Sequence, residues 1–173
     1  MTEQLLAELP DGTKMVLLDN TGDTLDVELV NAPNGGGPPA HFHTAMDETY
    51  EVIEGSFDVC VEGKWTRLEK GETVLVKAGQ SHTFANRSDA WSRVLMIHTN
   101  PGQLEAYFRE LGALCADGRV RSLNELGSLV HFARTMSAYP DDILVANPVQ
   151  RLVMRALGGL APVVGNAPQP AAR

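Results

Sequence analysis

Between residues 14 and 99, hydrophobic residues recur with a period of two in short segments, and after Thr99 the period becomes that of a helix. In TLDVELV, residues 24–30, Leu25, Val27 and Leu29 alternate with polar residues, as expected for strands with one buried face. Further strands are expected to begin near residues 15, 49, 56, 65, 73, 82 and 93. Gly-, Asn- and Asp-rich turns separate them, and no long helical pattern intervenes, which indicates a sandwich or barrel rather than a parallel sheet.

Three helical patterns follow the strands. Asn100 and Pro101 have the character of an N-cap and a first helical residue. Ser122 and Glu125 form an S-x-x-E pattern, which predicts a capping box at the start of the second helix. The third pattern begins at Val149 and places apolar residues at helical spacing, with arginines off the apolar stripe.

The length of 173 residues favours one compact domain. We expect the strands and the first helix to form a mainly β domain over residues 1–114. The other two helices would form a helical extension over residues 115–165. The last residues, 166–173, are rich in Pro and Ala and are expected to be a disordered tail.

The composition narrows the classes of partner. The chain has fourteen Lys and Arg and twenty-two Asp and Glu, which gives a net charge of −8. A negative net charge disfavours binding to nucleic acid, whose backbone is also negative. The N-terminal sequence lacks the pattern of a signal peptide, and no segment has the length of a transmembrane helix. Two cysteines, Cys60 and Cys115, show no disulfide or zinc spacing. We therefore expect a cytoplasmic protein that acts without nucleic acid or membrane, with both cysteines packed as small hydrophobes.

The stretch HFHTAMDE, residues 41–48, contains the first candidate metal ligands of the sequence. His41 and His43 are two residues apart, so on a strand both imidazoles point to the same side. Glu48 can bring a carboxylate to the same point, and His82 begins a later strand after a turn. Two histidines and a carboxylate are a recurrent ligand set for divalent transition metals. The alternative interpretation is a set of hydrogen-bonded histidines in the core or loops.

These residues lie in two motifs that resemble those of the cupin superfamily. The first motif reads GGGPPAHFHTAMDETYEVIEG, and its family positions are Gly35, His41, His43, Glu48 and Gly55. The second reads GETVLVKAGQSHTFAN, and its family positions are Gly71, Gly79, His82 and Asn86. Lys77 stands where the family has proline. The resemblance covers about residues 12–100. Within the family, the chain is similar to small bacterial cupins of the quercetin 2,3-dioxygenase type.

The resemblance implies a jelly-roll β-barrel with a C-terminal helical extension. It also implies that His41, His43, Glu48 and His82 bind one divalent transition metal: iron, manganese, nickel, cobalt, copper or zinc. Alternation along the strands makes Tyr50, Val52 and Phe84 candidate walls of a substrate pocket, or else ordinary core residues, since small barrels fill with side chains.

Three functions are open at this stage. The resemblance favours a dioxygenase that opens a small enolic or aromatic substrate, with Glu48 as the catalytic residue that holds the hydroxyl proton. The alternatives are a metal-dependent cyclase or isomerase, and a cupin that binds a small ligand without turnover. We expect a homodimer. Of the polar residues outside the motif positions, His98 and His131 are expected to be structural and Asp47 to be solvated.

Overall fold

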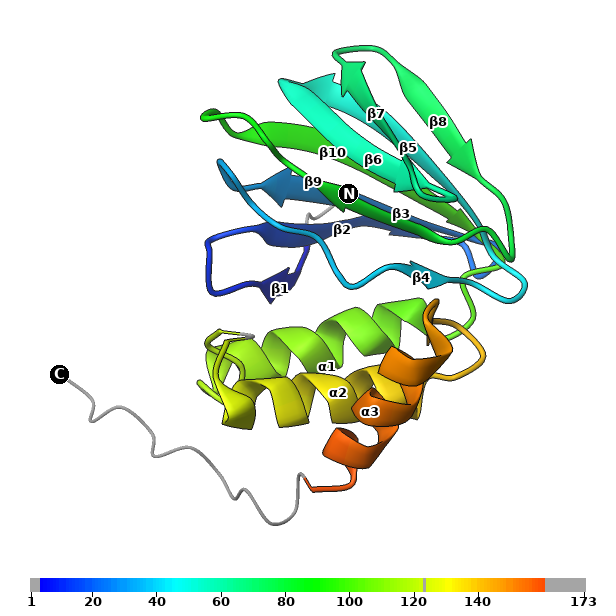
Figure 1. Ribbon diagram of the computed structural model, residues 1–173. Coiled ribbons are helices and arrows are strands. Elements are labelled where there is room, and N and C mark those ends of the chain that lie inside the picture. Colours follow the sequence, from blue (N-terminus) through cyan, green and yellow to red (C-terminus); the bar gives the residue numbers. More distant parts are fainter. Residues whose placement is uncertain (1–3, 123, 161–173) are drawn as a thin grey trace, which may run out of the picture.

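The computed structural model describes residues 4–122 and 124–160, which form two facing antiparallel sheets with three helices along one side (Figure 1). The six-stranded sheet has the order β1 (Gln4–Glu8), β2 (Lys14–Asn20), β3 (Thr24–Asn31), β10 (Ser92–Thr99), β5 (Asp47–Glu54), β8 (Thr73–Val76). The five-stranded sheet has the order β11 (Leu144–Val145), β4 (His41–Phe42), β9 (His82–Ala85), β6 (Ser56–Val61), β7 (Lys64–Glu69). The expected mainly β jelly roll is confirmed, as a sandwich of two sheets rather than a closed barrel.

Alternation along the strands fills the space between the sheets. On β3, Leu25, Val27 and Leu29 are at most 1% exposed, as the period of two predicts. Tyr50 and Phe57 approach to 5.3 Å between ring centroids, and Phe57 and Phe84 to 5.2 Å. The core therefore contains a cluster of aromatic rings from both sheets.

The helices are α1 (Leu104–Ala116), α2 (Leu126–Ala138) and α3 (Pro148–Gly158). Two predicted helix starts are wrong. Asn100 has a φ of 58° and its N–H donates to Asp23 O (2.9 Å), so it turns the chain out of β10 and the helix begins at Leu104. Ser122 Oγ accepts from the Asn124 N–H (3.2 Å), and α2 begins without a side-chain cap. Local side-chain hydrogen bonds of this kind compete with helix capping.

The third helix begins close to its predicted position. Asn147 caps it, accepting from the N–H groups of Val149 (2.9 Å) and Gln150 (3.1 Å), and Pro148 is the first helical residue. No helix in the described ranges 4–122 and 124–160 is long and apolar enough to cross a membrane. The expected tail, residues 166–173, lies outside the described residues.

Two strands, β1 and β11, have no counterpart among the predicted elements. β1 pairs with β2 and is covered by α1. At Gly112 of α1, a Cβ would lie 2.1 Å from Leu6 O, so only glycine permits this approach of helix to strand. β11 lies in the helical extension and joins the sheet beside β4.

The helical extension shares its core with the strands. Phe132, Met136 and Ile143 belong to the same buried cluster as Leu25 and Val94 of the six-stranded sheet. We therefore propose that the residues after 114 fold together with the 1–114 domain and not as a separate unit.

Lys77 is held by an ion pair at the position where the cupin motif has proline. Its Nζ donates to Asp47 Oδ2 (2.8 Å), and the Ala78 N–H donates to Asp47 Oδ1 (2.9 Å). Asp47 thus stays partly exposed and apart from Glu48, as expected, and in addition it forms an ion pair with Lys77. The carboxylate fixes the turn before β9 to the start of β5, so it supplies a restraint that proline would supply through its ring.

This contact predicts a pH-dependent loss of stability in Asp47→Asn. The hydrogen bonds from Lys77 and Ala78 lower the pKa of Asp47 below its ordinary value of 3.8. The stabilisation is therefore present above pH 4 and is lost as the pH falls through the lowered pKa. Asp47→Asn should unfold at a lower urea concentration than the native protein at pH 7, and the gap should be smaller at pH 3. An equal gap at both pH values would contradict the role of the carboxylate charge.

Candidate metal centre

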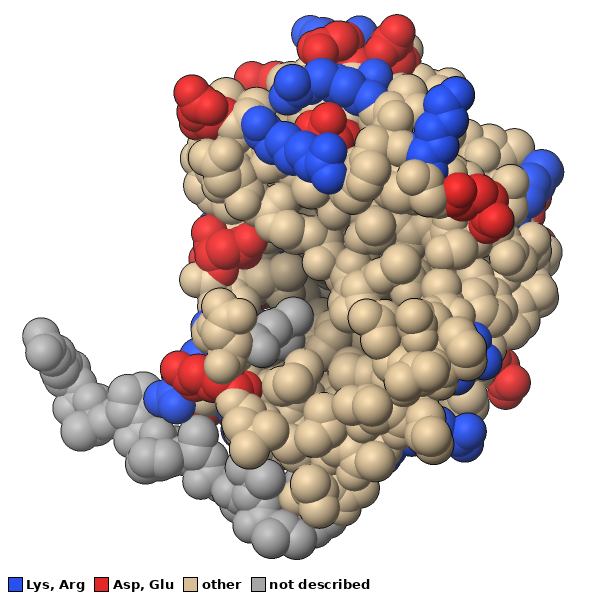
Figure 2. Space-filling view, viewed as in Figure 1, with Lys and Arg blue, Asp and Glu red and all other residues tan. Residues whose placement is uncertain are grey.

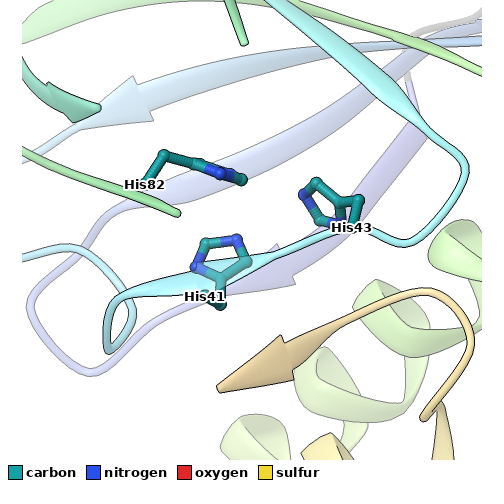
Figure 3. A group of neighbouring side chains, drawn as sticks. All are labelled: His41, His43 and His82. Atoms are coloured by element: carbon teal, nitrogen blue, oxygen red, sulfur yellow. The ribbon is translucent and has the colours of Figure 1, made fainter. Parts of the chain in front are cut away.

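Three histidine side chains meet at the end of the sandwich next to the helices. His41 lies on β4 and pairs across the sheet with His82, the first residue of β9, while His43 follows β4 directly. Their imidazoles point toward one another (Figure 3), with ring centroids 4.3 to 5.1 Å apart. One nitrogen of each ring lies within 4.8 Å of the others, and all three side chains are buried. This group could hold a metal ion.

Glu48, near the start of β5, faces the same point. Its Oε2 lies 2.9 Å from His82 Nε2 and 3.5 Å from His43 Nε2. These three atoms are buried, and none has a hydrogen-bond partner of good geometry. Buried polar atoms without partners are rare and costly. Because these converge, and because imidazole and carboxylate are common ligands of divalent metals, the residues fit a metal ion.

The imidazoles are oriented by backbone carbonyl groups. In each ring Nδ1 faces a carbonyl oxygen, which can only accept, so Nδ1 carries the hydrogen and Nε2 keeps a lone pair. The carbonyls belong to Pro39 for His41 (3.0 Å), Gln80 for His82 (3.1 Å) and Asp142 for His43. All three rings are thus held in the tautomer that offers Nε2 to a ligand.

Burial and neighbouring charges shift the pKa values of the side chains in the cluster in different directions. Burial, together with the neighbouring His82 and His43, lowers the pKa of His41 to about 3, so this ring is neutral near pH 7. Burial alone would raise the pKa of Glu48, but the close approach of His43, His82 and His98 outweighs it and holds the pKa well below its usual range. Burial opposes the charge on His82, and the adjacent Glu48 raises its pKa. An anionic carboxylate therefore faces the imidazoles.

His98 also belongs to this site, although the sequence analysis assigned it a structural role. It stands directly across from Glu48 in the pairing of β10 with β5. Its Nε2 lies 2.9 Å from Glu48 Oε1, and its Nδ1 donates to Leu25 O at 3.0 Å. His98 holds one carboxylate oxygen and leaves the other facing the histidines. The alternation of Val94, Met96 and His98 gave the signal, but the strand register was needed to interpret it.

A cavity of about 560 Å³ extends from this cluster to the helices. Tyr50 and Phe84, both candidate pocket residues, line it, whereas Val52 is not among the lining residues and lies in the core at 1% exposure. The helical side contributes Tyr107, Phe108, Leu111, Phe132 and Ile143. Figure 2 shows the surface hollowed between the strands and the helices, with most charged side chains gathered elsewhere on that face. The helices thus turn one end of the sandwich into an apolar chamber.

A jelly roll with a buried histidine cluster at one end defines a class of protein, and comparison with known families agrees with it. Residues 27–98 match the Cupin domain family. The similarity to the cupin domain is confined to this segment, which includes the three histidines and Glu48.

Two curated relatives match this chain, one at higher identity over a short segment and one at lower identity over a longer segment. The chain is 40% identical over 55 residues to the tetracenomycin polyketide synthase protein TcmJ of Streptomyces glaucescens, covering 32% of this chain and 37% of that protein. It is 27% identical over 128 residues to quercetin 2,3-dioxygenase of Bacillus subtilis, covering 62% of this chain and 37% of that protein. The chain thus spans little more than a third of the length of either relative.

Solved structures support the fold. An RmlC-like cupin from Shewanella frigidimarina has a TM-score of 0.52 at 18% identity, covering 59% of this chain and 87% of that one. A protein described as a predicted oxalate decarboxylase from Thermotoga maritima has a TM-score of 0.50 at 18% identity, covering 57% and 92%. At this identity the similarity concerns the jelly roll alone.

The geometry predicts which histidines retain metal. His43→Ala and His82→Ala should each lose most of the bound metal, because each removes an Nε2 that faces the cluster. His131→Gln is a control, since His131 packs in α2 outside the cluster. The measurement is elemental analysis by plasma mass spectrometry on protein purified without chelator. Undiminished metal content in both alanine variants would contradict the site.

Proposed function

We propose that the protein is a metal-dependent oxidoreductase of the dioxygenase type that opens a small enolic or aromatic substrate. His41, His43, His82 and Glu48 would hold a single divalent metal. The observation that carries the proposal is the position of this cluster, which lies at the wall of an apolar chamber of about 560 Å³. Such a chamber has the size and lining typical of a small-molecule site. The match to quercetin 2,3-dioxygenase supports an oxidative reaction.

A divalent metal held by four protein ligands would keep positions open for substrate, where it polarises a bound oxygen and, if redox-active, supports reaction with dioxygen. The protein supplies a proton acceptor beside that position. Glu48 Oε1 is held by His98, while Oε2 faces the histidines and has no other hydrogen-bond partner of good geometry. In the proposal, Oε2 takes the hydroxyl proton of an enol or phenol, as a carboxylate held within reach can do.

The remaining lining residues would bind a planar substrate and exclude water. Tyr50 and Phe84 stand 6.0 Å apart between ring centroids on the strand side of the chamber. Phe108 lies across from them on α1 and contacts His98 edge-on at 6.1 Å. Aromatic faces and edges stabilise a flat ring system by stacking and area burial. The enclosure also limits hydrolysis or proton leakage during the reaction.

A second candidate is a metal-dependent cyclase or isomerase, and the match to the polyketide synthase protein TcmJ makes a polyketide a possible class of substrate for it. This reaction needs the same chamber and the same carboxylate but no redox change at the metal. A third possibility, binding without turnover, would use the chamber alone. The metal that supports turnover separates the two enzyme candidates, because zinc would support a cyclase or isomerase but not a dioxygenase. Binding without turnover would give no product with any metal.

Oxygen uptake tests the proposed reaction. At least one of the forms reconstituted with iron, manganese, nickel, cobalt or copper should consume dioxygen with a member of a flavonol, diketone and catechol panel, and the zinc form should not. Glu48→Gln should lower kcat by a factor of about 10² or more, the usual contribution of a general base. Its metal content is measured in parallel, so that loss of the base is separated from loss of the metal. No uptake by metal-loaded native protein would contradict the proposal.

We also propose that the protein forms a homodimer through α3. Val149, Leu152 and Val153 are 69%, 70% and 50% exposed on this helix. Exposed apolar side chains gathered in this way are typical of an interface.

Solution mass tests the dimer. The native chain should have twice its mass of 18.7 kDa, and Leu152→Glu should reduce it to a monomer by placing a charge on the apolar face. Gln150→Glu introduces the same charge at an exposed polar position of α3 and should leave the mass unchanged. If Leu152→Glu remains dimeric, α3 does not form the interface.

A further inference from the structure

Residues 141–146 of the helical extension run alongside the strand that carries His41. Leu144 pairs with Phe42 and Val145 with His41. The Ala146 N–H donates to Ala40 O at 2.8 Å. In Figure 3 this segment is the tan strand beside the histidines. We call residues 141–146 the strap.

The strand β4 depends on the strap for much of its pairing. β4 has only two residues, and on its other edge it meets β9 through the single pair His41 and His82. Such a short strand gains little order from its own hydrogen bonds, because fixing each residue costs about 1–2 kcal/mol of backbone entropy. The two residue pairs with β11 therefore provide most of the strand pairing that holds the backbone at His41 in place.

The strap also orients His43 directly. His43 Nδ1 donates to Asp142 O, and Thr44 Oγ donates to Asp141 O. The histidines differ in how far along the chain the carbonyl lies that orients each ring. The carbonyls that hold His41 and His82 lie two residues away in sequence, whereas Asp142 is 99 residues from His43.

The strap is itself held in place by the rest of the helical layer. The N–H groups of Asp142 and Ile143 both donate to Tyr139 O, at 3.2 and 3.0 Å. The Asp142 side chain lies against the turn before α1, where a Cβ at Gly102 would be 1.9 Å from its Oδ1. Ile143 is 4% exposed and lines the chamber. The strap therefore contacts the substrate chamber on one side and the histidine cluster on the other.

We infer that the strap is a positioning element for the metal centre, and that it keeps His43 and β4 in the geometry that retains the metal. This inference rests on the metal centre proposed above and assigns part of its affinity to residues outside the matched segment 27–98. Hydrogen bonds to the far nitrogen of a metal-binding histidine fix its tautomer and direction, and their loss costs roughly 10–100-fold in metal affinity. Because Ile143 lines the chamber and the adjacent Asp142 holds His43, a displacement of the strap would alter both.

Leu144→Pro tests the inference, with Leu144→Ala as its matched control. Both remove the leucine side chain, but only proline removes the N–H that is available for pairing with β4. Competition between the protein and a coloured chelator for Co²⁺ measures affinity, and the visible spectrum of bound Co²⁺ reports its coordination. Leu144→Pro should weaken Co²⁺ binding about 10-fold or more and change the spectrum. Leu144→Ala should keep the native spectrum and bind Co²⁺ more tightly than the proline variant.

Thr44→Val is the second test and avoids any backbone change. It removes the hydroxyl that donates to Asp141 O, and it should release Co²⁺ several times faster than the native protein. Thr66→Val, an exposed position on β7, makes the same side-chain change away from the strap and should leave the release rate unchanged. This pair decides the matter if circular dichroism shows that Leu144→Pro does not fold.

The outcomes separate the strap from the metal centre. If the folded native protein binds no Co²⁺, the metal centre is wrong and the strap inference falls with it. If the native protein binds Co²⁺ while Thr44→Val and any folded Leu144→Pro retain native affinity, release rate and spectrum, the metal centre stands and the strap inference is overturned.

Discussion

Burial of imidazole nitrogens and a carboxylate at one point is the constraint on which much of this structure depends. Each such group would bond to water if it were exposed, so a fold that buries several together must supply partners or a cation. The protein supplies partners for every Nδ1 through backbone carbonyls and for one oxygen of Glu48 through His98. The atoms left over all face inward. Because the hydrogen-bonded atoms of the cluster are already occupied, the atoms without such bonds are the ones available to a ligand.

The helical extension changes what the jelly roll can enclose. A sandwich of two sheets leaves its ends open, and here one end is covered by α1 and α2 (Figure 1). Rings from α1 face rings from the strands, so the chamber wall is built from segments that are distant in sequence. The covering layer also reaches the histidine cluster through β11. Enclosure of a substrate and orientation of His43 therefore depend on the same stretch of chain.

The sequence predicted those parts of the molecule in which chemistry is encoded locally. Alternation located most strands, and the spacing of His41, His43, Glu48 and His82 brought four residues together that the structure also brings together. His98 and β11 were missed because their roles arise from pairing between distant segments. The wrong helix starts have a different cause: Asn100 turns the chain with a positive φ and bonds through its backbone N–H to Asp23, while the Ser122 side chain accepts a local hydrogen bond from Asn124. Composition could not reveal which preference prevails.

Gly112 has a consequence beyond the packing of one helix. Its contact with Leu6 O sets the distance between α1 and β1. Leu111, the residue before Gly112 on the helix, lines the chamber, and so does Leu9, three residues after Leu6. Any larger residue at 112 would wedge helix and strand apart. The position of Leu111 in the chamber wall therefore depends on a residue that does not itself line the chamber.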